Sequence, residues 1–254
     1  MTEINERFRA ARQAVLSESV STEGVGGLAE KSVHKILKLT LEPNTSMHEV
    51  EFLGSIADIK NGEGLFEIQT KNHHTLIPKL KKFLPNSKVT VVIPLIKEKF
   101  VRWINVETGE ISEKKRSPKH DDVYTALNLI FSLSELISDK NLKVKLVFFE
   151  ADEYKRLDGW DKTRKRGASK ADKIPTKILE VIDLDSVESY RRYIPEELAN
   201  EFLAKDFQKA IKRPARFTYY VIRFFVGIGL IEQVGKRGNA FVYKINYDSS
   251  SSIT

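Results

Sequence analysis

Two apolar runs constrain the fold of this 254-residue chain more than any other feature. The first, "VTVVIPLI" at 89–96, is almost continuously apolar and rich in β-branched side chains, and the second, "KVKLVFF", covers 143–149. Runs of this kind are typical of strands buried on both faces of a sheet, and helices must then cover that sheet. Both are far shorter than the roughly 20 residues that cross a bilayer, so we expect no membrane span.

The segment before the first run predicts a helix, three strands and a second helix. Residues 28–41 place apolar side chains on one helical stripe, and 74–84 have a helical pattern with a proline in the first turn. Between them lie three short strand-like segments, at 48–54, 55–61 and 65–71. The turn "NGEG" separates the last two strands, so an antiparallel meander is expected.

The third of these strands has one apolar face and one polar face. Side chains alternate along a strand, so Glu67, Gln69 and Lys71 share a side. The reversal at "NGEG" places Asp58 close to Glu67. Two converging carboxylates repel, and a hard divalent cation with a preference for oxygen ligands removes that repulsion. The competing interpretation is that these are solvated charges on the sheet surface.

The order and spacing of these residues resemble the PD-(D/E)XK nuclease superfamily, especially archaeal Holliday-junction resolvases and restriction-enzyme-like proteins. The resemblance covers roughly residues 25 to 96 and is carried by Glu30 in the first helix, "ADI" at Asp58 and "EIQ" from Glu67 to Gln69. It implies a restriction-endonuclease-like mixed sheet flanked by helices. The sequence departs from the family at Gln69, where a lysine is usual, and Lys71 follows on the same side of the strand.

The resemblance implies phosphodiester hydrolysis that depends on Mg²⁺ or Mn²⁺. Asp58 and Glu67 would hold the metal ion, and Glu30 would help directly or through water. Gln69 or Lys71 would orient the attacking water; a neutral amide can hydrogen-bond water but supplies no positive charge. A catalytically silent relative of the family is the alternative.

Residues 195–247 resemble a small winged helix-turn-helix domain. Residues 204–212 predict the first helix of the pair, 214–230 predict the second, and 230–245 predict a two-stranded wing. Arginine and tyrosine on the outer face of the second helix suit phosphates and base edges in the major groove. The predicted DNA contacts are Arg213, Arg216, Tyr219 and Arg223 on or before that helix, and Lys236 and Arg237 at the wing tip. The alternative is a winged helix that docks proteins only.

The positive charge of the chain is concentrated in its second half. The net charge is +7, and the stretch from Lys155 to Lys177 holds nine Lys/Arg against three Asp. Within it, Arg164, Lys165 and Arg166 are further candidates for phosphate contacts, or else part of a solvated linker. The chain has no cysteine, which excludes disulfides and thiolate metal sites and is consistent with a cytoplasmic protein.

These observations predict an α/β protein with two domains. The expected organisation is an arm and linker (1–24), a nuclease-like domain (25–150), a basic connecting segment (151–194), a winged-helix domain (195–247) and a disordered tail (248–254). The expected function is a metal-dependent DNA endonuclease. A non-catalytic DNA-binding protein and an RNA-binding or RNA-processing protein are the alternatives, and a homodimer is left open.

Overall fold

The computed structural model describes residues 2–22, 29–70, 76–160 and 166–247. The chain divides into two compact units, each assembled from segments that are distant in the sequence. The first unit contains Met1–Thr70, Val92–Asp121 and Leu146–Ile182; the second contains Lys71–Val91, Asp122–Lys145 and Asp183–Thr254. The predicted domain boundary near Glu150 therefore falls inside a strand, β6 (Leu142–Trp160).

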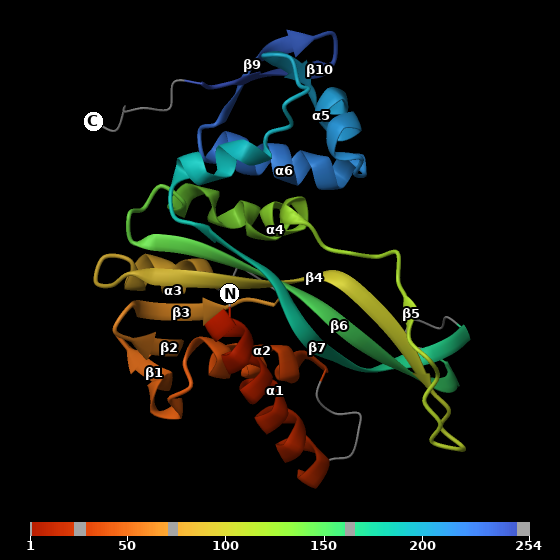
Figure 1. Cartoon of the computed structure of the whole chain (residues 1–254). Coiled ribbons are helices and arrows are strands. Elements are labelled where there is room, and N and C mark those ends of the chain that lie inside the picture. Colours follow the sequence, from red (N-terminus) through yellow and green to blue (C-terminus); the bar gives the residue numbers. More distant parts are fainter. Residues whose placement is uncertain (1, 23–28, 71–75, 161–165, 248–254) are drawn as a thin grey trace. The chain divides into compact units, whose positions relative to one another are not determined.

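A seven-stranded sheet runs in the order β1-β2-β3-β4-β6-β7, with β5 paired to β4 (Figure 1). Its strands are β1 (His48–Phe52), β2 (Ser55–Asn61), β3 (Gly64–Ile68), β4 (Val89–Ile104), β5 (Lys115–Arg116), β6 and β7 (Arg166–Leu184). The connection from β3 to its neighbour β4 contains helix α3 (Leu76–Phe83), and neighbouring strands joined by a helical crossover run parallel. Because β1, β2 and β3 pair antiparallel, the sheet is mixed, as predicted.

Tight turns set the register of the first three strands. The β1–β2 turn is Leu53-Gly54, and both residues have positive φ, as a type I′ hairpin requires. The "NGEG" turn joins β2 to β3 and pairs Ile59 with Phe66 and Lys60 with Leu65. The predicted antiparallel meander is confirmed.

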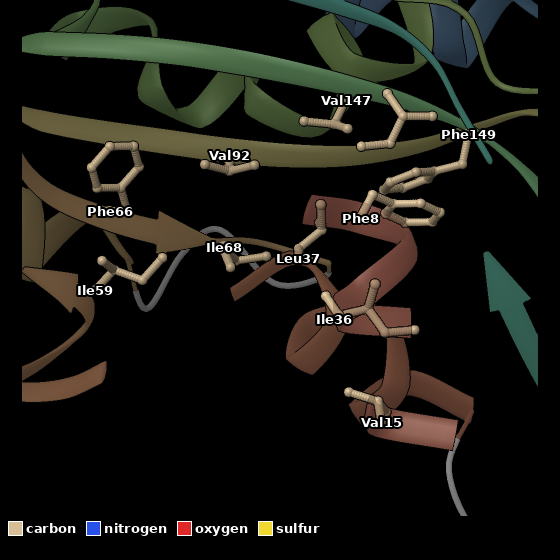
Figure 2. Close-up of a cluster of buried hydrophobic side chains, with 12 residues drawn as sticks. Phe8, Val15, Ile36, Leu37, Ile59, Phe66, Ile68, Val92, Val147 and Phe149 are labelled. Carbon is tan, nitrogen blue, oxygen red and sulfur yellow. The ribbon is translucent and has the colours of Figure 1, made fainter. Parts of the chain in front are cut away.

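Two helices cover the face of the sheet that carries Phe66 and Ile68. They are α1 (Thr2–Thr22) and α2 (Ala29–Leu41), which lie side by side in Figure 1. Figure 2 shows the core beneath them, where Phe8 of α1 stacks on Phe149 of β6 with ring centroids 6.3 Å apart. The prediction of an N-terminal arm was wrong, because α1 buries an apolar stripe in this core: Phe8, Ala11 and Val15.

Replacing Phe8 with alanine is expected to destabilise the first unit by about 3–5 kcal/mol, since the ring is 1% exposed and its removal leaves a cavity. Chemical denaturation monitored by circular dichroism measures the change. The exposed Arg7 on the same helix is the matched control, and Arg7→Ala should change stability by no more than about 0.5 kcal/mol. Equal stability of Phe8→Ala and the wild type would show that α1 is not part of this core.

The predicted basic connecting segment is instead the ends of two long strands. Strands β6 and β7 each have 19 residues, and β7 includes Pro175. The stretch after Pro175 is also strand, and Ile178 within it packs into the first unit's core as part of β7. The carbonyl of Pro175 accepts a hydrogen bond of 3.1 Å from Arg12 Nε on α1, which anchors the strand to the helix.

The C-terminal part of the second unit combines two helices with a three-stranded sheet of order β8-β10-β9. Its elements are β8 (Glu201–Leu203), α5 (Ala204–Ile211), α6 (Ala215–Gly227), β9 (Ile231–Arg237) and β10 (Ala240–Ile245). The helix pair and the hairpin predicted from the sequence are confirmed. Helix α6 begins after Pro214, whose carbonyl accepts a hydrogen bond from the backbone N–H of Thr218.

The second unit also packs α6 against α4 (Val123–Ile130) and the 3-10 helix η3 (Phe131–Leu136) (Figure 1). Phe131 and Tyr220 are in ring contact, with centroids 4.7 Å apart. A Cβ added at Gly227 would lie 2.4 Å from Ser134 Oγ, so glycine permits this close approach. No helix among the described residues is long and apolar enough to span a membrane.

Candidate functional site

The β2–β3 hairpin brings together two of the predicted acidic residues. Its register pairs Ile59 with Phe66, so the next position places Asp58 opposite Glu67. The backbone N–H of Ile68 donates to Asp58 Oδ2 at 2.7 Å, so a hydrogen bond joins the Asp58 carboxylate to strand β3. The prediction that the turn brings Asp58 and Glu67 together is therefore supported by the register.

Burial distinguishes these two carboxylates from ordinary surface charges. Glu67 is 1% exposed, and the Asp58 side chain is 16% exposed. All four residues from Leu65 to Ile68 are buried, so both faces of β3 are covered. The alternative that Glu67 is a solvated surface charge is wrong.

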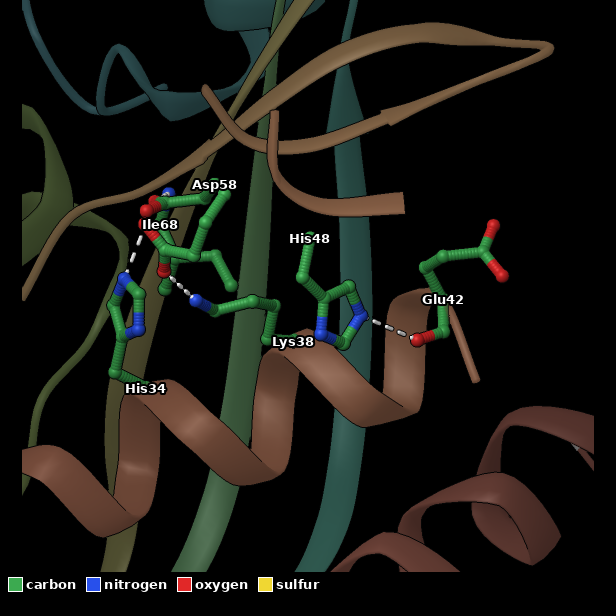
Figure 3. A network of polar contacts seen from close by, with 7 residues as sticks. His34, Lys38, Glu42, His48, Asp58 and Ile68 are labelled. Atoms are coloured by element: carbon green, nitrogen blue, oxygen red, sulfur yellow. Dashed lines mark hydrogen bonds and ion pairs between the residues drawn. The ribbon is translucent and has the colours of Figure 1, made fainter. Parts of the chain in front are cut away.

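Helix α2 directs two basic side chains at this region (Figure 3). His34 Nε2 donates to Asp58 Oδ2 at 3.2 Å. One helical turn later, Lys38 forms an ion pair with Glu49 of β1, and its side chain is 10% exposed. Because β1 pairs with β2 on both sides of this position, Glu49 lies opposite Asp58. The three carboxylates Glu49, Asp58 and Glu67 therefore occupy matching positions on three neighbouring strands; we call them the acidic row.

Sequence reasoning did not identify His34, Lys38 or Glu49. The available signal was the spacing of His34 and Lys38, which are four residues apart on a helix that also carries an apolar stripe, since residues so spaced share a face. Just after the C-terminal end of α2, His48 donates to the carbonyl of Glu42 at 2.7 Å. A backbone N–H bond from Asn44 is the main cause that lowers the pKa of the Glu42 carboxyl.

The other predicted catalytic residues are less well placed or fall outside the description. Gln69 directly follows β3 and is half-buried, and its backbone N–H donates to the carbonyl of Val92 at 2.9 Å. Glu30 lies in α2, but its side chain is outside the described part of the chain, as is the whole of Lys71. Within the described residues, no group of three or more His, Cys, Asp or Glu side chains is arranged to hold a metal ion.

Helix α6 exposes a narrow strip of side chains that includes three of the predicted DNA contacts. Arg216, Tyr219 and Arg223 are exposed, whereas Val221 and Phe225 on the opposite side are buried. Burial raises the pKa of Tyr243, Tyr219 raises it further and Arg223 lowers it, so this strip lies close to strand β10. The assignment of these three side chains to the outer face of the helix is confirmed.

The β9–β10 hairpin presents two more cations. Lys236 and Arg237 are exposed next to its turn, where Gly238 has the positive φ that glycine adopts readily. The ammonium of Lys236 lies 5.0 Å from the ring centroid of Phe241, which is itself 41% exposed. The tip of this hairpin is therefore exposed and positively charged.

Arg213 has a structural role that the sequence did not suggest. Its guanidinium pairs with Asp122 Oδ2 at 2.6 Å and lies over the ring of Phe217. Asp122 also caps α4 by accepting from the backbone N–H of Thr125. Arg213 therefore joins the start of α4 to the α5–α6 connection, and its contact with DNA stays a prediction from the sequence.

The basic cluster predicted in the connecting segment is not described in the structure. Arg164 and Lys165 lie outside the described residues. Arg166 begins β7, but its side chain is outside the description too. These three residues remain predictions from the sequence.

A family profile described as a domain of unknown function, DUF8091, matches residues 31–185, which is more than half of the chain. The chain belongs to the DUF8091 family. It is also similar to an uncharacterized protein of Treponema pallidum (strain Nichols), with 28% identity over 226 residues and 85% of each chain covered. No solved structure matches. The DUF8091 region contains the acidic row, His34 and Lys38, and it ends before the β8–β10 sheet.

Proposed function

We propose that this DUF8091 chain is a metal-dependent DNA endonuclease, with a restriction-endonuclease-like core and a C-terminal winged helix that holds DNA. The observation that carries the proposal is the pair formed by the partly buried Asp58 and the buried Glu67, placed opposite each other on β2 and β3. Opposed carboxylates with little access to water are costly, and a divalent cation offsets both their repulsion and their desolvation.

The order of elements supports the nuclease-like core. Helix α2 precedes the meander β1-β2-β3, helix α3 follows it, and β4 then lies next to β3. This is the arrangement of helix, three strands, helix and strand that the resemblance implies. In the second unit, the helix pair α5–α6 with the sheet order β8-β10-β9 supports the winged helix in the same way.

The residues present fit a magnesium or manganese ion by donor type. Mg²⁺ is commonly held by one or two carboxylates while it keeps waters and binds substrate phosphate oxygens, and Asp58 with Glu67 provides such a pair. When bound, the ion would stabilise charge on the phosphate and lower the pKa of a water molecule. The chain's own contribution is orientation, because Ile68 N–H and His34 both bond Asp58 Oδ2 and fix that carboxylate.

A second candidate is a DNA-binding protein without nuclease activity. It is favoured by Gln69, which supplies no charge at the position where the nuclease family usually has a lysine. The exposed strip Arg216, Tyr219 and Arg223 and the wing at Lys236 would serve either function. RNA remains the alternative polymer, because phosphate contacts do not distinguish the two.

A substrate screen separates these candidates. Purified protein is incubated with end-labelled linear duplex, branched and single-stranded DNA and with single- and double-stranded RNA. Each substrate is tested with Mg²⁺, with Mn²⁺ and with EDTA. We expect at least one DNA substrate to be cleaved internally when Mg²⁺ or Mn²⁺ is present. EDTA should abolish that cleavage. Binding of DNA without cleavage of any substrate would favour the non-catalytic protein, and cleavage of RNA alone would exclude the DNA enzyme.

A further inference from the structure

A small pocket opens where the hairpin that follows β4 meets β6. It has a volume of about 320 Å³, within the range of pockets that hold small ligands, and its described lining residues all belong to the first unit. The lining combines an indole, two branched apolar side chains and three polar side chains: Trp103, Ile111, Leu157, Asn105, Glu110 and Ser112. Such a lining suits a flat ring that carries hydrogen-bonding atoms on its edge.

Backbone hydrogen bonds form the hairpin side of this pocket. The N–H of Ser112 donates to the carbonyl of Trp103 at 2.9 Å, and the N–H of Asn105 donates to the carbonyl of Glu110 at 2.9 Å. Asn105 Oδ1 also accepts from the backbone N–H of Glu107 at 2.9 Å. These bonds hold the lining in place before a ligand arrives, which reduces the entropy cost of binding.

Apolar side chains around the pocket are exposed to water. Ile111 is 53% exposed and Leu157 is 47% exposed, and Val106 on the same hairpin is 51% exposed. Apolar side chains that gather at the surface mark sites of binding more often than those that are scattered singly. A bound ring would cover part of this surface.

Exposed cations lie next to the pocket on β5, which pairs with β4 (Figure 1). They are Lys114, Lys115 and Arg116. The Lys115 ammonium lies 5.9 Å from the centroid of the Trp103 ring, so this basic row reaches the pocket. Arg116 is 70% exposed while it pairs with Glu98 at 3.5 Å, and an exposed pair of this kind is weak enough for a phosphate to replace the carboxylate.

Positive charge also gathers on the β6 side of the pocket. Burial opposes ionisation of Glu153, yet Lys99, Lys173 and Lys155 together hold the pKa of its carboxyl below the usual value. Lys155 lies two residues before Leu157 on β6, so the two side chains share a face of the strand. Cations beside an apolar pocket are typical of surfaces that bind single-stranded nucleic acid.

We infer that this pocket takes one unpaired base of a single-stranded polynucleotide, while Lys114, Lys115 and Arg116 contact the neighbouring phosphates. A base in a duplex can enter only by leaving its stack, so single strands are favoured. The Glu110 carboxylate accepts from an exocyclic amine, which cytosine carries and thymine lacks. The inference rests on the proposed function in needing a polynucleotide, and it adds the form of strand that the protein recognises.

The choice of base is the first test. Fluorescein-labelled octamers of deoxycytidine and of deoxythymidine are titrated with the full chain in EDTA, which prevents metal-dependent cleavage, and anisotropy gives the affinities. The wild type should prefer deoxycytidine by about fivefold, and Glu110→Gln should lose that preference. The matched control is Glu107→Gln, an exposed residue of the same hairpin outside the described lining, which should keep it.

The ring of Trp103 is the subject of the second test. Trp103→Leu should weaken binding of the deoxycytidine octamer by about tenfold and leave duplex affinity within about twofold, whereas Trp103→Phe should retain most of the affinity. Leu157→Ser should also weaken binding of the octamer, and Ile56→Ser, at another exposed apolar position of the first unit, should not. Circular dichroism confirms that the variants are folded.

Tryptophan emission is a third, independent measurement. The chain has two tryptophans, so Trp160→Phe leaves Trp103 as the only one. Its fluorescence should be quenched when the octamer saturates the protein, because a base then contacts the indole. Binding of the octamer without any change in emission would place the strand elsewhere.

These outcomes separate the pocket from the nuclease. Equal affinity of the wild type and Trp103→Leu for the octamer overturns the inference, whether or not the protein cuts DNA. Octamer binding that depends on Trp103, with no cleavage of any substrate, supports the pocket and refutes the nuclease. Binding to phosphatidylserine vesicles but to neither octamer would assign this surface to lipid and overturn the inference.

Discussion

Replacing Asp58 with asparagine is expected to lower metal-dependent DNA cleavage by about a thousandfold or more. The substitution keeps the size of the side chain and a carbonyl oxygen that can accept from Ile68 N–H, but it removes the charge that would hold a divalent ion. Initial rates on the substrate identified by the screen, at a fixed Mg²⁺ concentration, measure the effect. Glu67→Gln should behave in the same way because it removes the other carboxylate of the pair.

A second aspartate of the first unit provides the matched control. Asp121 Oδ2 accepts a hydrogen bond of 2.9 Å from the backbone N–H of Ile96, as Asp58 does from Ile68, yet Asp121 is not part of the acidic row. Asp121→Asn should therefore cut at close to the wild-type rate, and DNA affinity should survive in all three variants. Full activity in both Asp58→Asn and Glu67→Gln would eliminate this hairpin as the site of hydrolysis.

The double substitution Arg216→Ala with Arg223→Ala is expected to weaken DNA binding by about 10- to 100-fold at physiological salt. Both guanidinium groups are exposed on α6 beside Tyr219, where phosphates or base edges can reach them. If each contacts one phosphate, the slope of log affinity against log salt should become shallower by about 2. Fluorescence anisotropy of a labelled duplex over a range of salt concentrations gives both quantities.

Loss of net charge alone must be separated from loss of this surface. Lys81→Ala with Lys88→Ala removes the same charge from exposed positions of the second unit that lie outside α6. That control should reduce affinity by no more than about twofold. Equal losses in the two double variants would show a diffuse charge effect, and unchanged binding in both would favour a winged helix that docks proteins.

Local patterns predicted the elements that carry the candidate site. The turn "NGEG" was sufficient to place Asp58 against Glu67, because hairpin register depends on a few neighbouring residues. The position of Lys38 relative to Glu49 depends on how α2 lies over the sheet, which no short-range pattern encodes. The role of Arg213 was missed for the same reason, since its partner Asp122 is 91 residues away.

The charged composition of one segment led to a wrong prediction, because its residues form long-range strand pairs that composition does not reveal. The basic stretch from Lys155 to Lys177 suggested a solvated linker, yet most of it extends β6 and β7, and Ile178 just beyond it reaches the core. Acidic and basic residues can line such strands when they pair with neighbours: Glu153 on β6 bonds Lys99 on β4 at 2.8 Å. Burial opposes ionisation of Glu153, and the bond and charge of Lys99 keep the carboxyl pKa below its usual value.

The first helix determines where the protein can be shortened. The DUF8091 match begins at residue 31, after α1, but Phe8 on α1 covers Phe149 and Ile178 in the core of the first unit. A recombinant fragment trimmed to the family boundary would leave those side chains bare to water and prone to aggregate. Expression for crystallography should therefore keep the amino-terminal 22 residues.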